Sequence, residues 1–132
     1  TMEKIRIKDI CKKQIKKGKA GTRELIKLFT EGYSVALMID QRVSEGIPVK
    51  FFNKTALTTT IPAQLVKKYD CEVVPIYIER FNKNYFKMNV EKPLIFRKDS
   101  SLDDITLKLN KKLELMILRN PDQWIWSHDR WK

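Results

Sequence analysis

The sequence predicts an α/β fold with a mixed, mostly parallel sheet flanked by helices, and three observations support this prediction. Residues 33–39 and 72–78 are short apolar runs without polar alternation, which is typical of strands covered on both faces. Between them we expect a helix over Ile61–Tyr69, because Pro62 suits a first helical turn. Strand, helix and strand in this order form a βαβ unit, whose two strands run parallel.

Polar residues follow each apolar run at the point where the strand should end. Asp40, Gln41 and Arg42 follow the first run, and Glu79 and Arg80 follow the second. Parallel strands share a carboxyl edge, and ligands of open α/β sheets bind just beyond that edge. We therefore expect these side chains along one rim of the sheet as a candidate site, although a solvated loop would carry the same residue types.

Local signals predict further elements in the second half of the chain. Residues 81–84 indicate a hairpin turn, and Tyr85–Val90 alternates as an antiparallel strand does. Ser101 and Asp104 have the spacing of a capping box, which marks the first turn of a helix. The buried stripe expected on this helix consists of Leu102, Ile105, Leu109, Leu113 and Met116.

The first part of the chain is predicted to hold two helices. Residues 2–10 indicate the end of one helix, and the basic residues 12–19 a connector. A second helix should follow Gly21, with Thr22 as its N-cap and Gly32 as its stop.

The composition is that of a single globular domain over residues 1–132, with 42% hydrophobic and 33% charged residues. No run approaches the roughly 20 apolar residues of a membrane span, and no signal-peptide pattern opens the chain. Cys11 and Cys71 are isolated and lack metal-ligand spacing, which favours a reduced, cytosolic setting. A nucleophilic Cys71 acting with His128 is an alternative that nothing local supports.

The net charge of +11 favours polyanionic partners: nucleic acid, anionic lipid headgroups or an acidic carrier protein. The densest basic cluster covers residues 12–19. It fits a nucleic-acid tract, or a cationic edge that faces a membrane or an acidic partner, and the cluster alone does not separate these interpretations.

Residues 124–132 combine three tryptophans with His128, Arg130 and Lys132. Three interpretations stay open: an aromatic cover over the core, an interfacial belt at a membrane, or a phosphate-binding corner formed by Arg130 and Lys132. His128 and Asp129 are adjacent, and because adjacent side chains diverge they form no dyad by themselves.

Together these landmarks resemble the bacterial lipid A biosynthesis acyltransferases (lauroyl and myristoyl transferases), within the lysophospholipid and glycerol-phosphate acyltransferase superfamily. The resemblance runs from about Gly21 to the last residue, in family order and spacing. The matching positions are Gly32, Val35, Ala36, Leu37, Ile39, Asp40, Gln41, Gly46, Ile47, Val49, Phe51, Phe52, Thr58, Thr59, Thr60, Pro62, Ala63, Leu65, Val74, Pro75, Tyr77, Arg80, Trp124, Trp126, His128, Arg130, Trp131 and Lys132.

One departure from the superfamily pattern concerns the catalytic base. Enzymes of this kind carry a histidine followed after four residues by Asp or Glu, and here the one histidine is His128. The resemblance therefore implies that the base motif and an amino-terminal membrane anchor lie upstream of Thr1. We expect this chain to be the carboxy-terminal part of a larger, glycerol-phosphate acyltransferase-like domain, incomplete and catalytically silent by itself, with no catalytic residue and no metal site of its own.

The resemblance implies transfer of a fatty acyl group from acyl carrier protein to a hydroxyl of a lipid A precursor, at the cytoplasmic face of the bacterial inner membrane. It implies no cofactor beyond the acyl carrier protein thioester, and the expected partners are the carrier protein, an anionic glycolipid acceptor and the membrane surface, without nucleic acid. A glycerolipid or lysophospholipid acyltransferase of the same superfamily is one alternative, and a non-catalytic nucleic-acid-binding module is another. The isolated chain is expected to be soluble and to form homo-oligomers, because half of a larger domain exposes apolar surface.

The resemblance also implies which residues bind substrate. Arg42 and Arg80 suit phosphate or oxyanion contacts, because a guanidinium can bond two oxygens at once. Asp40 and Gln41 would orient the acceptor or the arginines, although Asp40 could instead cap the following loop. The full set of implied substrate-binding residues is Asp40, Gln41, Arg42, Thr59, Arg80, His128 and Arg130.

Overall fold

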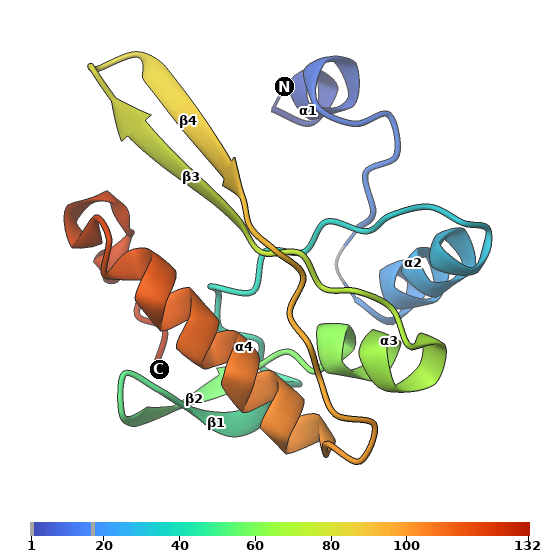
Figure 1. The fold of residues 1–132 in the computed structure, drawn as a ribbon. Helices are drawn as coiled ribbons and strands as arrows, with labels where there is room; N and C mark the ends of the chain where they lie inside the picture. The colour runs from blue at the N-terminus through green and yellow to red at the C-terminus, as the bar shows by residue number, and fades with distance from the viewer. Residues whose placement is uncertain (1, 17) are drawn as a thin grey trace. The chain divides into compact units, whose positions relative to one another are not determined.

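The computed structural model describes residues 2–16 and 18–132 (Figure 1). Thr1, and Lys17 of the predicted basic cluster, lie outside the described residues. The chain divides into two compact units, Thr1–Leu37 and Met38–Lys132. The second unit carries every candidate site residue.

Two helices form the first unit, α1 (Met2–Asp9) and α2 (Lys19–Thr30). The N-cap prediction for Thr22 is wrong, because α2 begins at Lys19 and the Thr22 hydroxyl donates to the Gly18 carbonyl one turn earlier, at 3.3 Å. The predicted stop at Gly32 is confirmed. Its φ of 92° lies in the left-handed region, which ends a helix at little cost only for glycine.

The predicted mostly parallel sheet is not found in the described chain, which instead has two separate antiparallel sheets of two strands each. Residues 33–39 are extended but belong to no strand. The described residues therefore form no βαβ unit, and the prediction of a shared carboxyl rim is wrong. Mixed helix and strand content is confirmed.

The first sheet is a hairpin that the sequence reasoning missed, formed by β1 (Ile47–Phe51) and β2 (Lys54–Thr58). Its two-residue turn, Phe52 and Asn53, has positive φ at both positions, as turns that match the twist of paired strands require. Val49, Phe51, Ala56 and Thr58 are buried on one face. This alternation was visible in the sequence, but Gly46 and Pro48 suggested a loop.

Two helices complete the core, and α4 is the one that covers the hairpin. Helix α3 (Ile61–Tyr69) has the predicted bounds, and α4 (Leu102–Ile117) packs against β1 and α3. The predicted stripe on α4 is partly confirmed, because Ile105, Leu109 and Met116 are buried while Leu102 is exposed. The core forms two clusters, one around Phe51 and one around Ala63.

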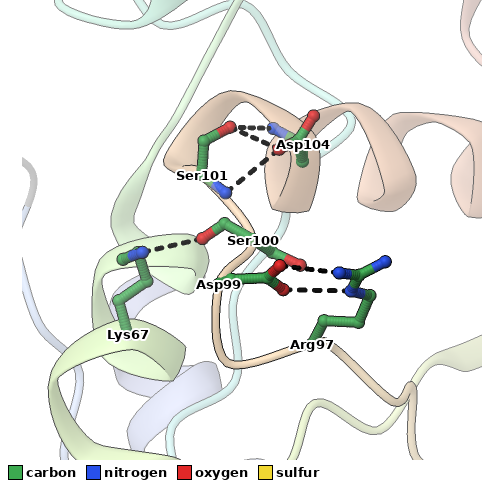
Figure 2. A network of polar contacts seen from close by, with 6 residues as sticks. All are labelled: Lys67, Arg97, Asp99, Ser100, Ser101 and Asp104. Atoms are coloured by element: carbon green, nitrogen blue, oxygen red, sulfur yellow. Dashed lines mark hydrogen bonds and ion pairs between the residues drawn. The ribbon is translucent and has the colours of Figure 1, made fainter.

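The start of α4 is fixed by the predicted capping box, which Figure 2 shows. The Ser101 hydroxyl accepts the Asp104 amide at 3.0 Å, and the Asp104 carboxylate accepts the Ser101 amide at 3.0 Å. Beside it, Lys67 of α3 donates to the Ser100 carbonyl at 2.7 Å, and Arg97 pairs with Asp99. The Lys67 contact ties the start of α4 to the end of α3.

The second sheet is the hairpin of β3 (Ile76–Phe81) and β4 (Tyr85–Val90), with Ile76 paired to Val90. The predicted turn and the predicted bounds of β4 are confirmed. The strand predicted at residues 72–78 is shifted, because Val73 makes only an isolated bridge to Leu94 and regular pairing begins at Ile76. Among the helices of the described residues, none is both long and apolar enough to cross a bilayer.

Candidate functional site

The predicted site residues lie in two places rather than along one rim. Asp40, Gln41 and Arg42 lie before the β1–β2 hairpin, whereas Arg80 lies in β3. Because the two hairpins are separate sheets, no common carboxyl edge unites Arg42 with Arg80.

A buried polar cluster lies at the end of β2, and we call it the Arg130 cluster: Arg130, Thr58 and Asn110. The Arg130 guanidinium donates to the Leu57 carbonyl at 2.6 Å and to the Thr58 hydroxyl at 2.9 Å. Asn110 of α4 donates to the same hydroxyl at 3.2 Å and to the Lys50 carbonyl at 3.0 Å. These hydrogen bonds join both strands of the hairpin to α4 and to the carboxy-terminal segment.

Asp40 provides the negative charge that acts on this cluster. Burial lowers the pKa of the Arg130 guanidinium, and the Asp40 charge opposes this shift. The Oδ1 atom of Asp40 and the Nε atom of Arg130 are buried without a hydrogen-bond partner among the described residues. The alternative in which Asp40 caps the following loop therefore has no hydrogen bond from Oδ1 to support it.

Arg42 is the exposed cation next to this cluster. Its guanidinium donates to the Ser44 hydroxyl at 3.1 Å, within the same loop. One residue further, the Val43 amide donates to the Leu57 carbonyl at 3.3 Å. The loop is thus bonded to the end of β2, while the Arg42 side chain stays accessible to an anion.

Thr59 lies at the entry to α3 and accepts the Ile61 amide through its hydroxyl, at 3.3 Å. The next position is Pro62, which has no amide hydrogen to offer. Two of the first helical positions therefore offer no free donor to an anion. The N-cap residue itself is Thr60, whose side chain makes no capping hydrogen bond, so the Thr59 hydroxyl serves the start of α3 in its place. Substrate contact by Thr59 stays a prediction.

Arg80 borders an open hollow of about 500 Å³ at the tip of the second hairpin. Gln123, which sequence reasoning missed, clamps the Arg80 backbone with hydrogen bonds of 2.8 and 3.0 Å. The guanidinium lies 5.2 Å from the centre of the Phe86 ring, which restrains its orientation. The hollow is lined by Ile78, Arg80, Phe81, Asn82, Lys83, Phe86, Asp122 and Gln123.

The carboxy-terminal tryptophans pack against the core. Trp124 and Trp131 lie 5.8 and 5.6 Å from the Phe51 ring, and the Trp131 indole donates to the Phe51 carbonyl at 3.0 Å. This packing favours the interpretation as an aromatic cover. His128 follows in the short helix η2 (Trp126–His128), where its side chain is exposed.

Neither cysteine nor metal chemistry finds support in the described residues. No group of three or more His, Cys, Asp or Glu side chains in residues 2–16 and 18–132 could hold a metal ion. Burial raises the pKa of the Cys71 thiol, which disfavours the thiolate that a nucleophile requires.

The sequence offered a signal for one member of the Arg130 cluster. Asn110 stands four residues after Thr106 and three before Leu113, on the face of α4 that carries the apolar stripe. A polar residue on a buried helix face needs a partner, so this position could have been singled out. Arg130 was singled out, but its complete burial was not expected.

With this geometry in place, comparison with known proteins identifies the family. The family model described as bacterial lipid A biosynthesis acyltransferase matches residues 5–132. The chain belongs to this family. The match begins earlier than the resemblance recognised from motifs, which started near Gly21, and so covers nearly the whole of this lipid A acyltransferase chain. A search of curated proteins gives no significant match.

Proposed function

We propose that this chain is part of an O-acyltransferase that moves a fatty acyl group from acyl carrier protein to a hydroxyl of a phosphorylated lipid A precursor. The family match over residues 5–132 is the observation that carries this proposal. The net charge of +11 supports it, because an acidic carrier protein and an anionic bilayer both favour a basic surface. We place the complete protein at the cytoplasmic face of the inner membrane.

The reaction requires a base and an oxyanion stabiliser. The acceptor hydroxyl oxygen attacks the thioester carbonyl carbon while its proton passes to the base, and the carbonyl oxygen becomes an oxyanion. Collapse of this intermediate breaks the carbon–sulfur bond, and the carrier thiolate leaves and takes up a proton. We assign the base to the histidine of a His-x4-Asp/Glu motif supplied from outside these 132 residues.

Within this chain, Arg42 and Arg80 are the proposed contacts to substrate phosphate or to the oxyanion. Both guanidinium groups are exposed and both are restrained, Arg42 by Ser44 and Arg80 by Phe86. A restrained fork loses less conformational entropy when it bonds two phosphate oxygens. Gln41, Thr59 and His128 remain proposed substrate contacts with no further support than the resemblance.

The experiment is acyl transfer by the complete protein, expressed from its whole reading frame. Supplied with acyl carrier protein loaded with a fatty acyl thioester and with a lipid A precursor, it should give a product heavier by one acyl chain, detected by mass spectrometry. Lysophosphatidic acid, offered as the competing acceptor, should react far more slowly. Preference for lysophosphatidic acid would point to the glycerolipid alternative, and no transfer to either acceptor would refute the proposal.

The isolated 132-residue chain makes a second test. We expect it to transfer no acyl group, because these 132 residues contain no His-x4-Asp/Glu motif. We also expect self-association in light scattering at tens of micromolar, an order-of-magnitude test concentration. Full activity of the isolated chain would contradict our assignment of the base, and a stable monomer would contradict the half-domain expectation.

A further inference from the structure

Arg130 has no exposed surface, although its sequence context suggested a phosphate contact. Its exposed fraction is 0%, and it is the largest fully buried side chain among the described residues. One face of its guanidinium lies 5.4 Å from the centre of the Phe51 ring. Its Nη1 and Nη2 atoms both donate to the end of β2. A side chain held this way does not reach a substrate on the surface, so any role in the reaction must be indirect.

The two acceptors of Arg130 are shared with other segments. The Leu57 carbonyl, 2.6 Å from Nη1, also accepts the Val43 amide at 3.3 Å. The Thr58 hydroxyl, 2.9 Å from Nη2, also accepts from Asn110 of α4. The Thr58 hydroxyl also donates to the Ala56 carbonyl, with 3.1 Å between the two oxygens. Its one hydrogen and both of its lone pairs are therefore used. The guanidinium therefore shares its two acceptors at the end of β2 with the loop after Asp40 and with helix α4.

The charge of Asp40 favours the same position of the loop. A buried guanidinium is costly unless a negative group lies near it, and removing one partner of such a pair leaves the other uncompensated. Asp40 is the acid whose charge acts on Arg130, and its Oδ1 atom is buried. Arg42, the exposed cation, stands two residues after Asp40. The position of Asp40 therefore limits where the Arg42 side chain can lie.

We propose that Arg130 is a positioning residue, whose buried fork holds the Asp40–Val43 loop against the end of β2 and thereby presents Arg42 to the substrate. The part concerning substrate rests on the function proposed above. The structural part, that Arg130 holds the loop, does not depend on it. Arg130 thus acts through Arg42 and touches no reacting group.

A double-mutant cycle in the complete protein tests the functional part. Arg130→Lys keeps the charge but loses the fork that spans two acceptors, whereas Arg42→Ala removes the proposed phosphate contact. If Arg130 acts through Arg42, the two losses in kcat/KM are not additive, and the double variant is no worse than Arg42→Ala alone. A double variant whose loss equals the product of the single losses would overturn the proposal, as would wild-type kcat/KM for Arg130→Lys. Arg97→Lys, at an exposed arginine paired with Asp99, is the matched control and should behave additively.

Amide hydrogen exchange tests the structural part without any activity. In Arg130→Lys the Val43 amide should exchange about tenfold faster, while the amides of α4 keep their protection. Unchanged exchange at Val43 would overturn the proposal even if acyl transfer is confirmed. Conversely, if the unmodified protein transfers no acyl group, the proposed function is refuted. The exchange rate of the Val43 amide then still decides whether Arg130 holds the loop.

Asp40→Asn serves where Arg130→Lys fails to fold. It preserves the shape of the side chain and removes only its charge, so faster exchange should again be confined to the loop around residues 40–43. Loss of protection throughout α4 in both variants would mean that the cluster sets global stability and not the position of the loop, which contradicts the proposal.

Discussion

The two hairpins of the second unit are similar in length and pairing but differ in what covers them. One face of β1–β2 is buried against α4, with Phe51 at 0% exposure, whereas Ile78, Phe86 and Met88 of β3–β4 are 58 to 63% exposed. Polar contacts hold the second hairpin instead: Asn120 reaches Tyr77 and Glu79, and Gln123 clamps Arg80. Alternation in the sequence therefore indicates a strand but does not reveal whether its apolar face is covered.

The difference also separates the two candidate arginines. Arg42 lies in a loop bonded to a buried polar cluster, and Arg80 lies on a hairpin with little apolar support. Local unfolding is easiest where few apolar contacts are buried, so we expect β3–β4 to open more readily than β1–β2.

The largest difference in stability should come from truncating one phenylalanine in each hairpin. Phe51→Ala removes a fully buried ring that packs against Trp124 and Trp131, and should lower the free energy of unfolding by about 3–5 kcal/mol. Phe86→Ala, at a ring 60% exposed, should cost less than about 0.5 kcal/mol. Urea denaturation of both variants measures this, and equal losses would mean that β3–β4 is covered after all.

A middle-sized effect is expected from the asparagine that binds each hairpin. Asn110→Ala removes the hydrogen bonds that its amide donates to the part-buried Lys50 carbonyl and to the buried Thr58 hydroxyl, which keeps Arg130 as a donor, and should cost about 1–3 kcal/mol. Asn120→Ala also removes two hydrogen bonds, to Tyr77 and Glu79, but this site is only half-buried and water can replace the donor. Its cost should stay near about 0.5 kcal/mol. A larger loss for Asn120→Ala than for Asn110→Ala would reverse the comparison.

The smallest effect concerns pH. Hydrogen bonds and charges from Lys112 and Arg119 lower the pKa of Glu91, which follows β4. A lowered pKa in the folded state contributes stability that is present above the unfolded pKa and is lost as pH falls through the folded pKa. Amide exchange in β3–β4 should therefore accelerate below the ordinary pKa of glutamate, before that of β1–β2. In Glu91→Gln this extra acid sensitivity should vanish, and its persistence would assign it to another group.

Local signals in the sequence predicted the elements that local interactions define. The bounds of α3 and β4 and the capping box at Ser101 were correct, because Pro62, alternation and the Ser101–Asp104 spacing each act within a few residues. That residues 33–39 form no strand was not predictable in this way, since a strand exists only where a neighbour supplies its hydrogen bonds. An apolar run indicates burial without identifying that neighbour.

The candidate site was predictable in its residue types and not in its arrangement. Asp40, Arg42 and Arg80 were recognised as charges that follow apolar runs, but their assembly on one rim depended on the parallel sheet. Arg130 was recognised by resemblance, whereas its burial depends on acceptors 72 and 73 positions earlier in the chain. Interactions over such separations leave no periodic pattern to read.

The hydrogen bond from the Trp131 indole to the Phe51 carbonyl spans 80 residues, and this separation has a consequence for synthesis. A ribosome adding about 5–20 residues per second needs roughly 4–16 seconds to pass from one partner to the other. Throughout that interval the Phe51 face of the first hairpin lacks the tryptophans that cover it, because residues 124–131 have not yet been synthesised. The nascent chain is therefore most open to aggregation, and most in need of a chaperone, between the emergence of β1 and that of residues 124–131.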